Sequence, residues 1–298
     1  MKVPPYLKKG DKIAIVAPAG RINMDLTDVV KLFESWGLEV VIGESVTSSF
    51  HQFAGDDQLR TKDFQAMLDD DTVKAVIAAR GGYGTVRIID ELNFSNFKSN
   101  PKWIVGYSDI TVLHCHIQAL FGVPTLHGPM PLNFPDATNT SLQSLRDALF
   151  GNEIHYDYTS ASPQVSGFAE GVLIGGNLAL LANTVGSVSE PDYTDKILFI
   201  EDVSEYYYSV DRMMRMLKRA GRLKDIRGLI IGGFTNLKDD DPSFGFNALE
   251  IIMEVIKEYD YPVATDFPAG HIDNNQSLIF GKKVSLSVQG TRVHLKYI

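Results

Sequence analysis

The chain has 298 residues, of which 44% are apolar and 22% are charged, and this composition excludes a disordered, collagen-like or fibrous protein. At about 150 residues per domain, the length predicts two domains. The net charge of −9 at pH 7, with no run of Lys and Arg, argues against nucleic acid or an anionic membrane surface as a partner.

Cysteine usage and hydropathy point to a cytoplasmic protein. Cys115 is the single cysteine, so no internal disulfide can form, and a reducing compartment fits. Residues 1–20 contain no apolar run of signal-peptide length. No stretch reaches the roughly 18 consecutive apolar residues of a membrane span. We therefore expect no membrane partner.

The first half of the chain alternates short apolar strands with amphipathic helices. The expected strands are 12–17, 38–42, 74–79 and 103–105, and the expected helices are 24–36, 59–68, 86–92 and 111–121. Such an alternation is typical of a mostly parallel sheet covered by helices on both faces. We therefore expect residues 1–150 to form a Rossmann-like or flavodoxin-like α/β domain.

The second half differs in pattern. Residues 151–168 are rich in Gly, Ser, Thr and Pro with weak periodicity, which predicts a linker. Beyond it we expect strands at 171–174, 197–200 and 229–231, helices at 178–185, 210–220 and 248–259, and a hairpin over 278–298 that turns at Gln289-Gly290. Residues 169–298 are thus predicted to form a mixed α+β C-terminal domain.

Ser108 lies between a predicted strand and a predicted helix, in the segment VGYSDIT. A nucleophile on such a turn is lifted out of the sheet and surrounded by backbone N–H groups of the helix start, which can hold an oxyanion. Ile110 replaces the last glycine of the G-x-S-x-G pattern. The alternative is that Ser108 or Asp109 simply caps the helix.

A glycine loop, Gly81-Gly82, follows another predicted strand. Adjacent glycines let the backbone approach a ligand closely, but the spacing matches neither phosphate-loop pattern. The loop therefore either donates an N–H toward Ser108 or forms an ordinary turn. Arg80 beside it could grip a substrate carboxylate through two hydrogen bonds or form a surface salt bridge.

Glu201 and His271 complete the set of candidates. Glu201 stands with Asp202 at the end of a predicted strand, where the alternative is a solvated loop start. His271 lies in a Gly- and Asn-rich loop, a suitable place for a general base. In the order Ser108, Glu201, His271, the acid could orient the histidine and the histidine could deprotonate the serine.

We expect neither a bound metal nor a cofactor. No HExxH, CxxC or Ca²⁺-loop pattern occurs. His114 and His116 bracket Cys115 in an apolar helix, but residues two apart on a helix do not face each other. Core packing is the preferred interpretation of both.

The sequence resembles the LD-carboxypeptidase family of serine peptidases, which includes the microcin-C self-immunity peptidases. The resemblance spans nearly the whole chain and rests on GDKIAIVAPAG, ARGGYG, VGYSDIT, LFIEDVSE with the downstream Asp211-Arg212, and PAGH, in the family's order. It implies a triad of Ser108, Glu201 and His271, with an oxyanion hole from the N–H of Asp109 and the Gly81-Gly82 loop.

The resemblance also implies a homodimeric cytoplasmic enzyme that trims the terminal D-alanine from murein tetrapeptides in cell-wall recycling. Its active site would lie between an N-terminal domain with the nucleophile and a C-terminal domain with Glu and His. Two alternatives stay open. One is a microcin-C-type peptidase that acts on a modified nucleotide, and the other is a two-domain binding module without catalysis.

Overall fold

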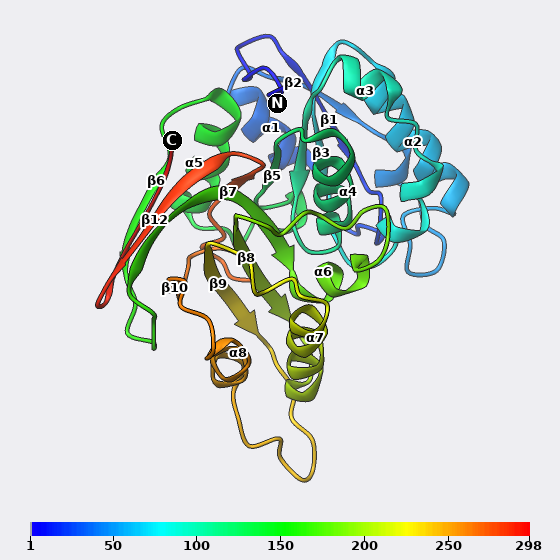
Figure 1. Cartoon of the computed structure of the whole chain (residues 1–298). Coiled ribbons are helices and arrows are strands. Elements are labelled where there is room, and N and C mark those ends of the chain that lie inside the picture. Colours follow the sequence, from blue (N-terminus) through cyan, green and yellow to red (C-terminus); the bar gives the residue numbers. More distant parts are fainter. Residues whose placement is uncertain (1) are drawn as a thin grey trace.

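Buried parallel strands form the centre of a six-stranded sheet in the computed structural model, which describes residues 2–298 (Figure 1). The order is β11-β5-β4-β3-β1-β2, and β11 alone is antiparallel to its neighbour. The strands are β1 (Lys12–Val16), β2 (Glu39–Ile42), β3 (Val73–Ala78), β4 (Trp103–Gly106), β5 (Thr125–His127) and β11 (Leu278–Phe280). This parallel-rich sheet confirms the predicted α/β class.

Alternate residues of these strands pack against helices on opposite faces. On one face, Ile13 and Ile77 meet α1 (Thr27–Ser35) and α5 (Asn139–Phe150). On the other, Ala14 and Val76 meet α2 (Asp57–Asp69), α3 (Ser95–Ser99) and α4 (Thr111–Phe121). Because both faces are covered, the central strands β1, β3 and β4 are mostly apolar instead of alternating with polar residues.

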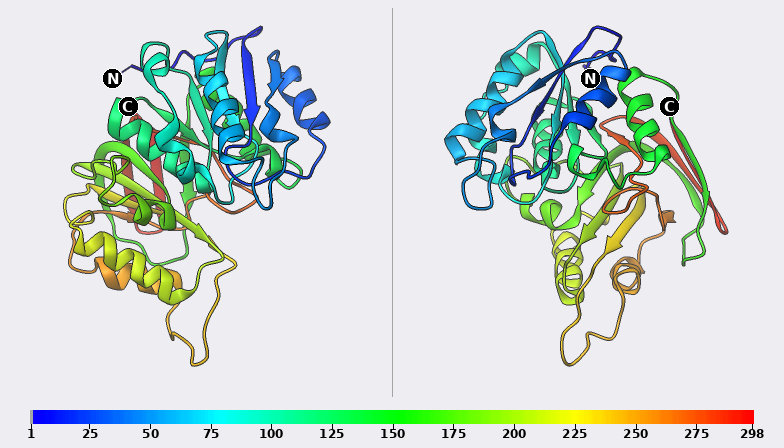
Figure 2. Two further views of the ribbon diagram at one scale, coloured as in Figure 1. Left: turned by 90° about the vertical axis from the view of Figure 1, so that its right-hand side faces the viewer. Right: turned by 180° about the vertical axis from the view of Figure 1, so that it is seen from behind.

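A second, seven-stranded sheet is mixed, with order β10-β9-β8-β7-β12-β13-β6. Its strands are β6 (His155–Thr159), β7 (Gly167–Asn177), β8 (Lys196–Val203), β9 (Gly228–Thr235), β10 (Val263–Ala264), β12 (Lys283–Gln289) and β13 (Arg292–Tyr297). One face is covered by α6 (Leu178–Thr184), α7 (Tyr207–Arg219) and α8 (Ala248–Ile256), and Figure 2 shows α7 beside α8. No helix within residues 2–298 is long and apolar enough to cross a bilayer.

The segment 151–168 is not a simple linker, because it contains β6. This strand pairs with β13 at the edge of the second sheet. Tyr156 and Tyr158, two residues apart, both pack on Phe267, as expected for side chains on the same face of a strand. Residues 155–159 form a strand because Tyr156 and Tyr158 alternate with polar residues and place their rings on one buried face.

Two other elements differ from expectation. The helix predicted over 86–92 is a pair of short 3₁₀ turns, η2 (Thr85–Arg87) and η3 (Ile89–Glu91). Three of its seven residues are β-branched, which disfavours helix, and a segment this short gains little cooperative stability. The hairpin predicted over 278–298 is formed by β12 and β13 only, since β11 leaves to join β5 in the first sheet.

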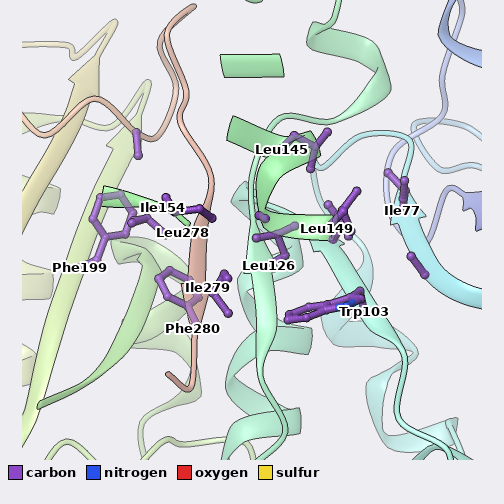
Figure 3. Packing of buried hydrophobic residues seen from close by; sticks show 14 of the residues in the cluster. Ile77, Trp103, Leu126, Leu145, Leu149, Ile154, Phe199, Leu278, Ile279 and Phe280 are labelled. Atoms are coloured by element: carbon purple, nitrogen blue, oxygen red, sulfur yellow. The ribbon is translucent and has the colours of Figure 1, made fainter. Parts of the chain in front are cut away.

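Strand β11 unites the two halves in one apolar core. Figure 3 shows Leu278, Ile279 and Phe280 between Phe199 of β8 and Leu126 of β5. All five side chains are at most 3% exposed. The two sheets are therefore held together by continuous packing, and loops at their boundary have a rigid foundation.

Candidate active site

Ser108 occupies the sharp turn between β4 and α4 and begins a 3₁₀ turn, η4 (Ser108–Ile110). Its φ is 62°, a left-handed conformation that costs energy in a residue with a Cβ. The side chain is half-buried. The predicted strand-to-helix turn is therefore present, and its backbone is strained at the hydroxyl residue.

A hydrogen-bonded chain links Ser108 to two residues of the second half. His271 lies in the loop between β10 and β11, and its Nε2 is 3.1 Å from Ser108 Oγ. Its Nδ1 is 2.6 Å from Glu201 Oε2, at the end of β8. Because the carboxylate can only accept, Nδ1 carries the proton and Nε2 is free to accept from the serine. The three side chains can thus move a proton away from Ser108 Oγ.

Carboxylates buried beside His271 change the pKa of its imidazole. Burial alone would lower the pKa of His271, but the carboxylate of Glu201 and that of Asp202 favour the imidazolium and raise this pKa above its usual value. The Glu201 side chain is fully buried, and its Oε1 has no hydrogen-bond partner within residues 2–298. Burial, reinforced by Glu201, raises the pKa of Asp202 to about 7. The site therefore holds its negative charge close to the imidazole.

The glycine loop lies directly against the serine turn. A Cβ added to Gly81 would stand 2.9 Å from Ser108 Cβ, 3.0 Å from Ser108 Oγ and 3.3 Å from the backbone nitrogen of Asp109. Only glycine allows this approach. The loop and the start of η4 thus bring backbone groups of two chain segments together around the Ser108 hydroxyl.

Arg80 follows β3, and its side chain lies against a neighbouring loop. Its Nη1 donates to the carbonyl of Arg21 at 2.8 Å, and its guanidinium lies against Gly20 and Gly82. Among residues 2–298 no salt bridge to Arg80 is present, and its Nε is buried without a hydrogen-bond partner. A role for Arg80 in holding a substrate carboxylate stays a prediction.

The histidines of α4 are part of the packed interior. His114 and His116 are at most 5% exposed, and each bonds to one neighbour, the carbonyl of Gly106 for the first and the Ser189 hydroxyl for the second. Among residues 2–298, no group of three or more His, Cys, Asp or Glu side chains is arranged to hold a metal ion.

A pocket of about 220 Å³ opens beside His271. Sequence reasoning did not identify most of its lining residues, among them Asn133, Asp136, Asn236 and Asn275. Asn275 lies in the GHIDNN segment, so its position near His271 was a usable signal. The other three follow unremarkable turns, and only the folded chain brings them to the site.

The comparisons with known proteins agree with this architecture. Models of the LD-carboxypeptidase N-terminal and C-terminal domains match residues 13–128 and 170–286. A probable murein peptide carboxypeptidase of Bacillus subtilis is 34% identical over 95% of this chain and 91% of its own.

Solved structures give the same fold. The muramoyltetrapeptide carboxypeptidase from Oxalobacter formigenes superposes with a TM-score of 0.87 at 29% identity, covering 96% of this chain and 98% of its own. The microcin C7 self immunity protein MccF has a TM-score of 0.85 at 22% identity, covering 98% of this chain and 97% of its own. At that identity, the second likeness describes the fold alone.

Proposed function

Because this chain belongs to the LD-carboxypeptidase family, we propose that it is a serine carboxypeptidase that releases the C-terminal D-alanine of murein tetrapeptides. The observation that carries the proposal is the chain of hydrogen bonds from Glu201 through His271 to Ser108. A nucleophile, a base and an acid that orients the base are the parts that acyl transfer requires.

The reaction proceeds in two steps. His271 Nε2 takes the proton of Ser108 Oγ, which attacks the carbonyl of the L,D-peptide bond. The imidazolium then protonates the departing amine of D-alanine, and water, deprotonated by His271, hydrolyses the acyl-enzyme. Glu201 holds the Nδ1–H tautomer and offsets the positive charge that develops on the ring.

Backbone donors stabilise the negative oxygen of the tetrahedral intermediate. We assign this role to the N–H of Asp109 and to the Gly81-Gly82 loop, which lies within contact of Ser108. Removal of one such donor costs about 3 kcal/mol of barrier height, or roughly a hundredfold in rate.

The charges around the site suit a peptide with separate cationic and anionic groups. Asp136 and Asp273 line the pocket beside His271, and no Lys or Arg lines it. A diamino acid residue of a murein peptide would place its free amine here. Arg80, next to the glycine loop, would then meet the C-terminal carboxylate.

The alternative activity is cleavage of a peptidyl or aminoacyl nucleotide, as in a microcin-C-type peptidase. Such a substrate needs an aromatic surface for its base. Trp36 and Trp103 are at most 8% exposed, so both tryptophans are committed to the core. This observation disfavours the nucleotide, although Tyr and Phe side chains such as Tyr83, which is 49% exposed, remain available to stack on a base. A binding module without catalysis would not need the Ser108–His271 hydrogen bond.

The test is mass spectrometry of the products formed from a panel of defined L,L- and L,D-tetrapeptides and a peptidyl adenylate. We expect loss of D-alanine from the L,D-peptides only. Ser108→Ala should abolish turnover, whereas Ser99→Ala, an exposed serine on α3, should not change it. Turnover by Ser108→Ala, or preference for the adenylate, would contradict the proposal. Sedimentation of the purified chain tests the homodimer, and localisation in cells tests the cytoplasmic compartment.

A further inference from the structure

The side chain of Asp109 fastens the glycine loop to the serine turn. It is 1% exposed, and its Oδ2 accepts a hydrogen bond of 2.8 Å from the backbone N–H of Thr85, at the far end of the loop. Its own backbone nitrogen lies beside Gly81. One residue therefore touches the loop at both of its ends.

A buried arginine holds the same loop from the other side. The side chain of Arg60, on α2, is fully buried, and its Nη1 donates to the carbonyl of Gly84 at 3.0 Å and also to that of Pro18. Gly84 has a φ of 146°, and a Cβ there would stand 2.6 Å from Arg60 Nη1. The guanidinium thus occupies space that only a glycine leaves open.

The two side chains form a charged support beneath the loop. Asp57, at the start of α2, accepts from Arg60 at the protein surface, whereas the buried Asp109 lies near the guanidinium without a salt bridge to it, and burial raises the pKa of its carboxyl. Burying charges is costly, and a packed apolar group often gives equal stability. Stability alone therefore does not account for a buried arginine and a buried aspartate beneath this loop, whereas fixing the position of the loop backbone does.

We propose that Asp109, through its carboxylate, and Arg60 are positioning residues that hold the Gly81–Thr85 loop at a set distance from Ser108, so that its backbone N–H groups stay aimed at the developing oxyanion. The inference rests on the proposed function. The tetrahedral oxyanion moves away from the ground-state carbonyl position, so a loop displaced by a fraction of an ångström weakens transition-state binding more than substrate binding.

The test compares Asp109→Ala with Asp109→Asn, whose amide oxygen can still accept from Thr85, and Arg60→Met with Arg87→Met. The side chain of Arg87 binds the same Asp57 carboxylate, and only its backbone N–H, which the substitution keeps, donates to a loop carbonyl, that of Gly84. Arg87→Met is therefore a matched control for the side chain. The readouts are kcat and KM on the L,D-tetrapeptide, affinity for a peptidyl boronic acid that forms a tetrahedral adduct with Ser108, and the urea midpoint of each variant.

We expect Asp109→Ala and Arg60→Met to lose about a hundredfold in kcat and in boronate affinity, as for a lost oxyanion donor, with KM nearly unchanged. Asp109→Asn should recover most of this loss, and Arg87→Met should match the parent protein. If either loop variant is too unstable to assay, Arg60→Lys decides, and we expect for it a smaller loss of the same kind.

Wild-type kcat in the folded loop variants would overturn the inference and leave the proposed function intact. An equal loss of boronate and substrate affinity would also overturn it, because that pattern marks general damage to binding. Turnover by Ser108→Ala would instead refute the proposed function itself.

Discussion

Tyr107 packs against the imidazole of His271, with ring centroids 4.8 Å apart and ring planes at 58°. Tyr107 immediately precedes Ser108, whereas His271 arrives from the second half of the chain. The phenol is 4% exposed, and its hydroxyl donates to Asn133 Oδ1 at 3.0 Å. One face of the His271 ring is therefore shielded from water by the residue next to Ser108.

Removal of the whole Tyr107 ring should displace His271 more than removal of the Tyr107 hydroxyl alone. We expect Tyr107→Ala to lower kcat by up to about a hundredfold, because a small displacement of a catalytic group is costly. Tyr107→Phe loses one neutral hydrogen bond, worth about 1 kcal/mol of stability, and should keep its kcat. Steady-state kinetics with urea unfolding of both variants checks this, and an equal kcat in the two would show that the ring does not position His271.

Replacing Glu201 by Gln removes the charge that supports the imidazolium and allows the wrong tautomer. By the behaviour of other triads, kcat should fall by roughly 10³- to 10⁴-fold. Glu190→Gln is the control, because Glu190 pairs with Arg222 outside the active site. Its kcat should not change, and a Glu201→Gln enzyme with near-normal kcat would exclude the triad.

The pH profile follows from the raised pKa of His271. A general base must be neutral, so kcat/KM should rise with pH through an apparent pKa above 6.5, the usual histidine value. Because the pKa of Asp202 is itself raised to about 7, this residue is partly protonated over the acid limb, so Asp202→Asn should move the limb only slightly to lower pH. An acid limb below 6.5 in the wild-type enzyme would contradict the assigned electrostatics.

The raised pKa of His271 also makes the free energy of unfolding depend on pH. Since the folded state binds the His271 proton more tightly than the unfolded state, this residue stabilises the fold fully below about pH 6.5. That contribution is lost as pH rises through the folded-state pKa. Urea unfolding of the wild type and His271→Gln across this range measures the difference, which should shrink with rising pH.

Gly81 should not tolerate a side chain. In Gly81→Ala the new Cβ would press on Ser108 Cβ at 2.9 Å, so the loop must retreat and kcat should fall by about a hundredfold, as for a lost oxyanion donor. Gly167→Ala is a matched control at the start of β7, where the nearest contact is Pro262 at 3.2 Å. Comparable kcat in the two variants would remove the loop from the mechanism.

Phe199 tests the core that joins the halves. It is fully buried and packs on His127, Phe267 and Phe280. Phe199→Ala should lower the free energy of unfolding by about 3–5 kcal/mol. Denaturant unfolding measures the loss, and a change below about 1 kcal/mol would show that this cluster does not stabilise the fold.

The sequence allowed the regular parts of the fold to be predicted, because buried parallel strands such as 74–79 and amphipathic helices such as 210–220 have strong periodicity. It did not reveal β11, since its three apolar residues are compatible with either sheet and only tertiary packing decides. The strand in 155–159 was hidden by polar neighbours.

At the site, motifs identified Ser108, Glu201 and His271 because each stands where a strand or loop meets a turn. Distances between them depend on how the two halves pack, which no local pattern encodes. Arg60 was overlooked because a charged residue on a helix normally faces water, and its burial becomes evident only once the glycine loop lies above it.

Because β11 pairs with β5, the first sheet can be completed only late in translation. The nascent N-terminal half emerges with one edge of its sheet open, and the strand that closes that edge is translated more than 150 residues after β5. Ser108 therefore lies in an unfinished sheet until β11 has been translated, and the proposed hydrolysis cannot begin before that point.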